Sequence, residues 1–293
     1  MVAKDRDLWA KWLLHRRFGG DPEELQRTLD FLYPIRDKVL ANARIQAGDT
    51  LLDVGAGDGL IAFGALEQIG PTGKVILSDI SQDLLDHDRT LAEETDVADR
   101  CEFIYAAAED LSPIPDASVD VVTTRSVLIY VADKQRAFDE FFRVLRPGGR
   151  ISLFEPINRF GYPEQPNKFS GHDVMPVEDI AAKVRALYCE RQPLDEDSML
   201  NFDERDLLAF VEQAGFAERH LEYHVDTQTM PPRRWETVSQ TAYNPRMPTL
   251  TEAMAEVLTP AETERFVAYL KPLVEQGGGT MNFASAYLWA VKQ

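Results

Sequence analysis

The sequence predicts an α/β fold in which a mostly parallel β-sheet is covered by helices on both faces. Between residues 50 and 156, short apolar segments alternate with stretches of helical periodicity. A glycine-rich turn, Gly55 to Gly59, follows the first of these segments, and an acidic residue, Asp79, ends the second. Strands that alternate with helices form parallel sheets, because each crossover helix packs back onto a sheet face.

Seven apolar segments have the length and flanking turn residues of strands. They span residues 50–54, 74–79, 101–106, 119–124, 150–155, 217–226 and 282–291. Helical periodicity is predicted between them for residues 59–69, 82–95, 134–145 and 204–213. The sequence therefore predicts a seven-stranded sheet within one large domain.

Three further segments do not fit a minimal fold of this kind. Residues 1–45 follow helical spacing, with a stop and restart at Gly19-Gly20-Asp21-Pro22, and are expected to form an N-terminal helical cap. Residues 46–226 are expected to form the core. It carries an insertion at 157–202, with a helix over 177–188.

A second insertion precedes the last strand. Residues 227–281 are expected to form a helical lid, with helices near 249–258 and 260–275, and residues 282–293 return to the core. Because long insertions in compact domains are usually functional, we expect a lid over a substrate. A contact in a homodimer is the alternative.

The turn after the first strand has the pattern Gly55-x-Gly57-x-Gly59. Glycines allow a tight turn and the close approach of a ligand, and the next helix offers free N–H groups. Asp79 is placed to accept hydrogen bonds from ribose hydroxyls. Leu60 stands where a dinucleotide fingerprint has its third glycine, so NAD(P) is disfavoured. We expect a ligand that contains a nucleoside.

At these residues the chain resembles the class I S-adenosylmethionine-dependent methyltransferases. The resemblance covers about residues 45–156 and includes the turn Arg143-Val144-Leu145-Arg146-Pro147-Gly148-Gly149-Arg150 before the fifth strand. It is greatest with the small-molecule branch that contains the quinone-biosynthesis and arsenite methyltransferases. The resemblance implies a Rossmann-like fold, S-adenosyl-L-methionine as cofactor, and a small-molecule methyl acceptor. It leaves O-, N- and C-methylation open.

The resemblance also implies roles for residues at the ends of the strands. Asp79 binds the ribose, Ile80 packs on the adenine, and Asp53 orients the loop or reaches the cofactor ammonium through water. The backbone near the methionine part is that of Gly55, Ala56 and Gly57.

The third strand end departs from the family pattern, because Ala107 stands where the family has an aspartate. The adenine amino group is then met by Glu109 or Asp110, or the ring is read by the backbone at Ala108.

Two charged residues near the reactive end are candidates for catalysis. Arg125, followed by Ser126, ends the fourth strand, and a cation there needs an anionic partner. That partner is the cofactor carboxylate, an acidic side chain or the acceptor, with a surface salt bridge as the alternative. Glu155 ends the fifth strand and is either a general base or a partner of Arg125.

Other residues outside the match are expected near the acceptor. His15 and His172 are candidates to close on it. A few aromatic residues of the flanking segments are expected to line an apolar acceptor pocket. They come from the set Trp9, Trp12, Phe18, Tyr33, Tyr162, Phe169 and Trp235.

Arsenite is rejected as a substrate on chemical grounds, since the chain has only two cysteines, Cys101 and Cys189, and Ser126 stands near the position where arsenite methyltransferases carry a cysteine. Three thiolates for arsenic cannot be assembled from two cysteines. We expect no metal site either. His220 and His224 alternate along a strand opposite Leu221, Tyr223 and Val225, which should be buried, so the histidine face is expected to be solvated or covered by a helix.

The net charge of −18 argues against nucleic acid and against an anionic membrane surface as partners. The N-terminus is charged from Lys4 onward, unlike a signal peptide, so a cytoplasmic protein is expected. Two other functions stay open at this stage. One is a partner protein that binds the cofactor without catalysis, and the other is a protein or amine N-methyltransferase.

Overall fold

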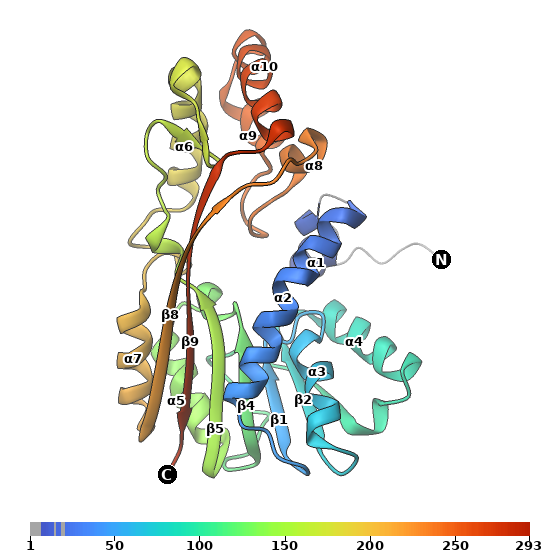
Figure 1. The fold of residues 1–293 in the computed structure, drawn as a ribbon. Helices are drawn as coiled ribbons and strands as arrows, with labels where there is room; N and C mark the ends of the chain where they lie inside the picture. Colours follow the sequence, from blue (N-terminus) through green and yellow to red (C-terminus); the bar gives the residue numbers. More distant parts are fainter. Residues whose placement is uncertain (1–6, 15, 19–20) are drawn as a thin grey trace.

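The computed structural model describes residues 7–14, 16–18 and 21–293 (Figure 1). His15 and the first half of the expected break at residues 19–22 lie outside the described residues. The remaining chain forms a sheet-based core with a helical cap above it.

The core is a seven-stranded sheet with the order β3-β2-β1-β4-β5-β9-β8. The first five strands run parallel and β9 and β8 are antiparallel to their neighbours. Their bounds are β1 Thr50–Val54, β2 Lys74–Asp79, β3 Cys101–Tyr105, β4 Val119–Arg125, β5 Leu145–Pro156, β8 Glu218–Thr229 and β9 Thr280–Val291. The predicted seven-stranded, mostly parallel Rossmann-like sheet is confirmed.

Helices cover both faces of this sheet. One hydrophobic core lies under α2, α3 and α4, and the other under α5 and α7. Polar side chains cap several helix N-termini, such as Ser81 for α4, Asp133 for α5 and Asp203 for α7. The helix bounds are α2 Pro22–Asn42, α3 Leu60–Ile69, α4 Gln82–Glu94, α5 Lys134–Val144 and α7 Glu204–Gln213.

The second half of α2 belongs to the core. Leu32, Ile35, Val39 and Leu40 are buried in the cluster under α3. The expected N-terminal cap of residues 1–45 therefore extends down onto the sheet, because the last turns of α2 are apolar on the face toward α3 and β5.

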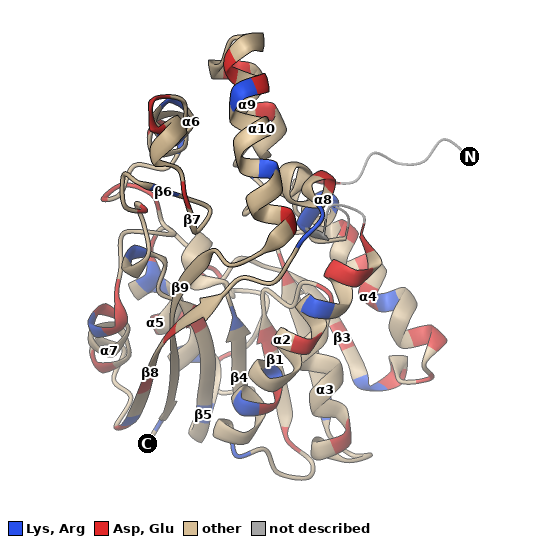
Figure 2. Ribbon diagram, turned by 45° about the horizontal axis from the view of Figure 1, so that its top comes forward, with Lys and Arg blue, Asp and Glu red and all other residues tan. Residues whose placement is uncertain are grey.

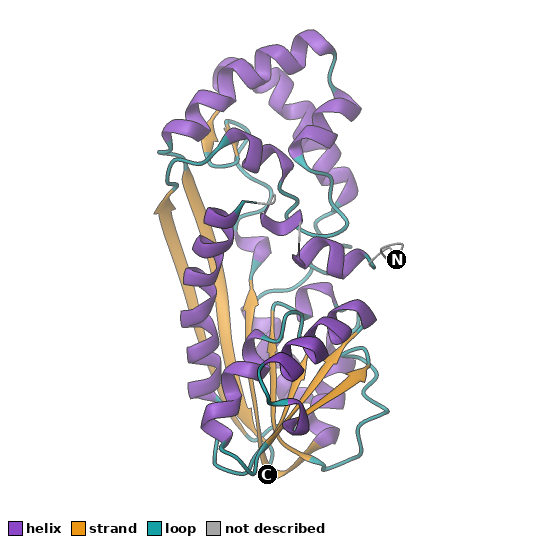
Figure 3. Cartoon of the chain, turned by 90° about the vertical axis from the view of Figure 1, so that its right-hand side faces the viewer, coloured by secondary structure: helices purple, strands orange, loops and turns teal. Residues whose placement is uncertain are grey.

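The two insertions pack together into one helical cap with its own hydrophobic core (Figures 1 and 3). The first contributes the β6–β7 hairpin (Lys168–Phe169, His172–Asp173) and α6 (Glu178–Arg191). The second contributes α8, α9 and α10 at the tip of the long β8–β9 hairpin. Their bounds are Trp235–Gln240, Leu250–Val257 and Pro260–Gln276. The sequence predicted α6, α9 and α10 but not the short α8 or the β6–β7 hairpin.

One pair of residues expected to be buried is not. Tyr223 and Val225 on β8 are 38% and 47% exposed. The upper part of β8 extends as an edge strand toward the cap (Figure 1), whereas α7 covers the lower part of the hairpin. Alternation along a strand predicts which residues share a face but not how far a covering helix reaches.

The N-terminal helix α1 (Leu8–Leu14), followed by the short helix η1 (Arg16–Phe18), connects core and cap. Leu13 packs with Leu84 of α4. The Trp12 indole Nε1 donates a hydrogen bond to the Ala242 carbonyl at 2.9 Å. Arg16 pairs with Glu252 of α9 at 2.9 Å. These contacts hold α1 between the nucleotide loop and the cap.

Acidic residues are spread over helices of both the core and the cap (Figure 2). No helix among the described residues has both the length and the apolar composition needed to cross a bilayer.

A test of the cap as a separate packing unit is Phe266→Ala. Phe266 is fully buried, and its ring meets Phe169 edge-on at 5.3 Å. The cavity should destabilise the cap by about 3–5 kcal/mol. Hydrogen exchange should accelerate in α6, α9 and α10 and stay slow in β1 and β4, because the cap core shares no residues with the sheet cores. Leu208→Ala, at an exposed position of α7, is the matched control. Equal acceleration in β1 and β4 would contradict independent packing.

Candidate cofactor and acceptor site

A cavity of about 510 Å³ opens at the carboxyl ends of the strands, beneath α1 and the cap. The loops after β1, β2, β3 and β4 line one part of it, and residues from α1 and both insertions line the other. In open α/β sheets, ligands bind at this edge.

The loop after β1 is fixed by two close contacts. A side chain at Gly55 would place its Cβ 2.4 Å from Val127, and Gly55 has a positive φ of 65°. Only glycine fits both conditions. The Gly57 N–H donates to the Asp79 carboxylate at 3.0 Å. Gly55 and Gly57 both line the cavity, whereas Ala56 is buried behind them.

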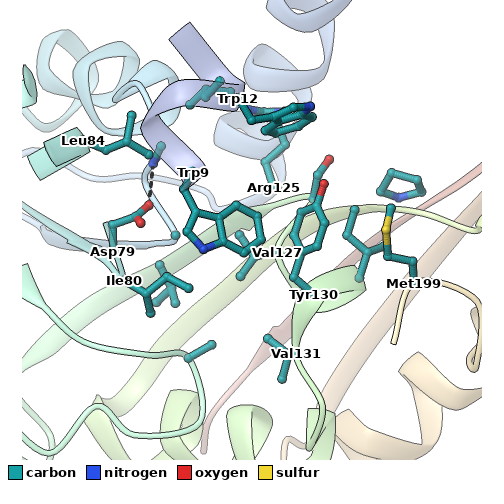
Figure 4. Close-up of a pocket in the computed structure, with 18 of the residues that line it drawn as sticks. Trp9, Trp12, Asp79, Ile80, Leu84, Arg125, Val127, Tyr130, Val131 and Met199 are labelled. Atoms are coloured by element: carbon teal, nitrogen blue, oxygen red, sulfur yellow. Dashed lines mark hydrogen bonds between the residues drawn. The ribbon is translucent and has the colours of Figure 1, made fainter. Parts of the chain in front are cut away.

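Asp79 lies at the end of β2 and lines the cavity (Figure 4). Its carboxylate also accepts the Ser81 N–H at 2.8 Å. Burial raises the pKa of Asp79, and the hydrogen bonds from Gly57 and Ser81 oppose that shift. A carboxylate offers about four lone-pair sites, so two backbone donors leave room for ribose hydroxyls.

Asp53 does not line the cavity. Its carboxylate accepts the Thr123 hydroxyl at 2.9 Å and the Ala62 N–H, in the first turn of α3, at 3.2 Å. Burial raises the pKa of Asp53 to about 7, against the effect of the Thr123 hydrogen bond. Of the two roles expected for it, orientation of the loop agrees with these contacts. The structure does not bring it to the cofactor side.

After β2 and β3, the cavity is lined by Ile80, Ala107, Ala108 and Glu109. The Glu109 carboxylate accepts the Ala132 N–H at 3.3 Å. Asp110 turns away and accepts the N–H of Ser112 at 3.1 Å. Of the alternatives expected for the adenine amino group, Glu109 and the backbone at Ala108 are the ones near the cavity.

Arg125 and Ser126 line the cavity at the end of β4. Within the part of the chain that the structure describes, Arg125 makes no ion pair or hydrogen bond with another side chain. Its expected pairing with Glu155 is therefore absent.

Glu155 is fully buried and does not line the cavity. Its carboxylate accepts the N–H groups of Val127 and Leu128 at 3.0 Å and of Ile129 at 3.3 Å. Burial raises the pKa of Glu155 to about 7, although these bonds favour the charged form. Neither expected role, general base or partner of Arg125, is supported by these contacts. Glu155 positions the loop after β4, because the start of the short helix η3 (Leu128–Tyr130) needs an acceptor for its free N–H groups.

His172 lies in the cap, with its ring packed so closely on Gly279 that a Cβ there would approach it to 2.8 Å. It does not line the cavity, so the structure gives no support to a catalytic role. Burial lowers its pKa. The other histidine candidate, His15, lies outside the described residues. His220 and His224 on β8 each meet a glutamate of the same strand, and the described residues hold no cluster suited to a metal ion.

Two of the expected aromatic residues do line the cavity. Trp9 stands edge-on to Tyr130, with ring centroids 4.8 Å apart, and Trp12 lies nearby (Figure 4). Phe169 and Trp235 belong instead to the cap core. Tyr33, 39% exposed, and Tyr162 lie elsewhere, and the Phe18 side chain is outside the described part.

Several residues that line the acceptor part of the cavity were not predicted from the sequence, among them Arg17, Tyr130, Met199 and Tyr243. Tyr130 could have been predicted from the sequence, because it follows β4 by one short turn at the ligand-binding edge of the sheet. The others come from segments whose position over the sheet no local pattern specifies.

The site fits a nucleoside joined to an amino acid. It offers a glycine turn next to Asp79, apolar side chains at Ile80 and Ala107, and open space toward α1. Fold and site define an S-adenosylmethionine-dependent methyltransferase. The comparison with known families agrees, since the sequence model of the ubiE/COQ5 methyltransferase family matches residues 33–230. The chain belongs to this family, and its cofactor is S-adenosyl-L-methionine.

Two curated relatives illustrate the range of the family. The ubiquinone/menaquinone biosynthesis C-methyltransferase UbiE of Hahella chejuensis is 33% identical over 58% of this chain and 68% of its own. An arsenite methyltransferase of Halobacterium salinarum is 36% identical over 42% of this chain, but the matched part spans only 31% of that protein. Among solved structures, geranyl diphosphate C-methyltransferase of Streptomyces coelicolor A3(2) has a TM-score of 0.54 at 17% identity, covering 96% and 85% of the two chains.

Asp79→Ala tests the ribose site. Loss of hydrogen bonds to a charged acceptor should weaken S-adenosylhomocysteine binding by roughly 1.5–3 kcal/mol, about 10- to 100-fold in Kd. Calorimetry measures the change, and Asp86→Ala, an exposed carboxylate on α4, is the control. Unchanged affinity in Asp79→Ala would exclude the ribose assignment.

A further buried acid near the loop gives a pH prediction. Among the described residues, neither carboxylate oxygen of Asp88 has a hydrogen-bond partner, and one buried oxygen of Asp58 also has none. Burial, with repulsion from Asp58, Asp79 and Asp53, raises the Asp88 pKa from 3.8 to about 8. The folded state thus holds a proton that the unfolded chain has lost, so Asp88 costs stability increasingly as the pH rises from about 4 to 8.

Asp88→Asn removes this charge with little change of shape. We expect the variant to be more stable than the wild type at pH 9 by about 1–3 kcal/mol, the cost of an unpaired buried group. The advantage should shrink at pH 5, where Asp88 is protonated in the folded wild type. Urea unfolding across this range measures it. Parallel pH profiles of the two proteins would show that Asp88 does not titrate as described.

Proposed function

We propose that this protein transfers the methyl group of S-adenosylmethionine to a small-molecule acceptor bound in the same cavity. The observation that carries the proposal is the continuity of that cavity. Gly57 and Asp79 line it beside the nucleotide loop, and Trp12, Met199 and Tyr243 line it beneath the cap.

The cofactor supplies an electrophilic methyl group. The protein contributes position and a dry environment. Trp9 and Trp12 on α1 cover the cavity, and Val127 and Ile129 form an apolar wall after β4. Holding two reactants in a closed, oriented site is a major source of rate in a displacement of this kind.

Among the described residues that line the cavity, the carboxylates are Asp79 and Glu109. We assign Asp79 to the ribose and Glu109 to the adenine, so neither is assigned to the acceptor. Burial raises the pKa of Tyr130 to about 12, so its hydroxyl stays protonated and serves as a donor. We infer an acceptor whose nucleophilic atom loses its proton without help from a basic side chain. The class of that atom, oxygen, nitrogen or carbon, stays open.

Arsenite does not suit this site. Cys101 starts β3, at the sheet edge opposite the cavity, and Cys189 lies exposed on α6. Neither lines the cavity. A protein acceptor is also disfavoured, because α1 and the cap cover the reactive end of the site.

The test uses S-adenosylmethionine labelled in its methyl group, incubated with the small-molecule fraction and, separately, the protein fraction of a cell extract. We expect label in the small-molecule fraction, with at least about a tenfold loss for Asp79→Ala at subsaturating cofactor. Label confined to protein would support a protein N-methyltransferase instead. No transfer despite tight binding of S-adenosylhomocysteine would favour the non-catalytic partner protein.

A further inference from the structure

The acceptor part of the cavity contains two polar groups that lack partners. Among the described residues, nothing accepts a hydrogen bond from the Arg125 guanidinium or from the Tyr130 hydroxyl, and both residues line the cavity. Figure 4 shows them on the side of Trp9 away from Asp79. Donors left unpaired in a buried site cost free energy unless a ligand accepts from them.

A second arginine, Arg17 from the segment after α1, lines the same cavity. Burial, followed by repulsion from Arg125, lowers the pKa of Arg17 to about 10, so the two guanidiniums lie close enough to affect each other. The charges of Arg17, Arg125 and Arg246 also act on Tyr130. Asp58 attracts Arg17 and buried Glu155 lies near Tyr130, but neither bonds to Arg125.

These two arginines line a cavity in a chain with a net charge of −18. The cofactor brings no net negative charge, because its one carboxylate is accompanied by an ammonium and a sulfonium. Even with the cofactor carboxylate on Arg125, the sulfonium stays beside the acceptor. An amine acceptor would add a further positive charge, whereas an anion would remove the repulsion.

The rest of this wall is apolar. Trp9, Trp12, Val131, Met199 and Phe283 line the cavity around the two donors. A ligand that satisfies the whole surface therefore has a hydrophobic body and one anionic group.

We propose that the methyl acceptor is an amphipathic anion whose carboxylate or phosphate group is bound by Arg125 and Tyr130, with Arg17 adding to the positive potential. This inference rests on the proposed function, since it names the substrate class of the same site. A guanidinium suits both anions, because its planar N–H groups bind two oxygens at once.

The experiment uses protein saturated with S-adenosylhomocysteine and four probes of equal chain length: octanoate, octyl phosphate, 1-octanol and octylamine. Calorimetry should give affinity for at least one anion about tenfold or more above that for 1-octanol, and the weakest binding for octylamine. Comparison of octanoate with octyl phosphate identifies the anionic group.

Two variants and a matched control assign the effect to residues. Arg125→Gln should weaken the preferred anion about tenfold and leave 1-octanol unchanged, while Arg125→Lys retains part of the affinity. Tyr130→Phe should cause a smaller loss for the anion alone. Arg89→Gln, which removes an exposed arginine of α4, should have no effect.

A separate arm examines the cofactor carboxylate. S-adenosylhomocysteine is compared with 5′-methylthioadenosine, which lacks the amino-acid part. Two results would overturn the proposal. In one, the Arg125→Gln substitution weakens the binding of S-adenosylhomocysteine but does not change the binding of the anionic probes. In the other, the wild type binds the anions and 1-octanol with equal affinity. If S-adenosylhomocysteine itself fails to bind the wild type, the proposed function fails instead, so the two failures are distinguishable.

Discussion

The site depends on a buried carboxylate that is not itself part of the cavity. Glu155, at the end of β5, receives three backbone N–H groups from residues 127–129 and so fixes the loop after β4. That loop carries Arg125, Val127 and Tyr130 into the cavity. Val127 in turn packs where any side chain at position 55 would stand, so the loops after β1 and β4 interlock. One acid thereby couples the nucleotide loop to the acceptor wall.

A few hydrogen bonds also join the core to the cap. Lys134, at the start of α5, donates to the Val131 and Ser198 carbonyls and to the Asn201 side chain. This ties the end of the loop after β4 to the segment that carries Met199. On the opposite side, Trp12 bonds to Ala242 of the second insertion. The acceptor wall is thus assembled from three distant parts of the chain, each held by polar contacts to a neighbour.

The sequence predicted those functional residues that belong to a local sequence pattern. Gly55, Gly57 and Asp79 follow strands at fixed spacing, so both the sheet and the cofactor edge could be predicted, and the strand bounds differ little from the observed ones. Asp53 was expected to orient the loop or to reach the cofactor, and Glu155 to act as a general base or to pair with Arg125, because both are acids near strand ends. Their actual partners, Thr123 with Ala62 and the residues 127–129, are distant along the chain. Arg17 and Met199 reach the cavity only through tertiary packing, which periodicity does not encode.

We propose that one cavity holds the cofactor at the nucleotide loop and presents its reactive end to Arg125 and Tyr130 beneath α1. A crystal structure of the protein with S-adenosylhomocysteine tests it most directly. We expect the ribose on Asp79, the adenine beside Ile80 and Ala108, and the sulfur facing the space between Trp9 and Tyr130. A ribose placed away from Asp79, or a sulfur pointing to bulk solvent, would contradict it.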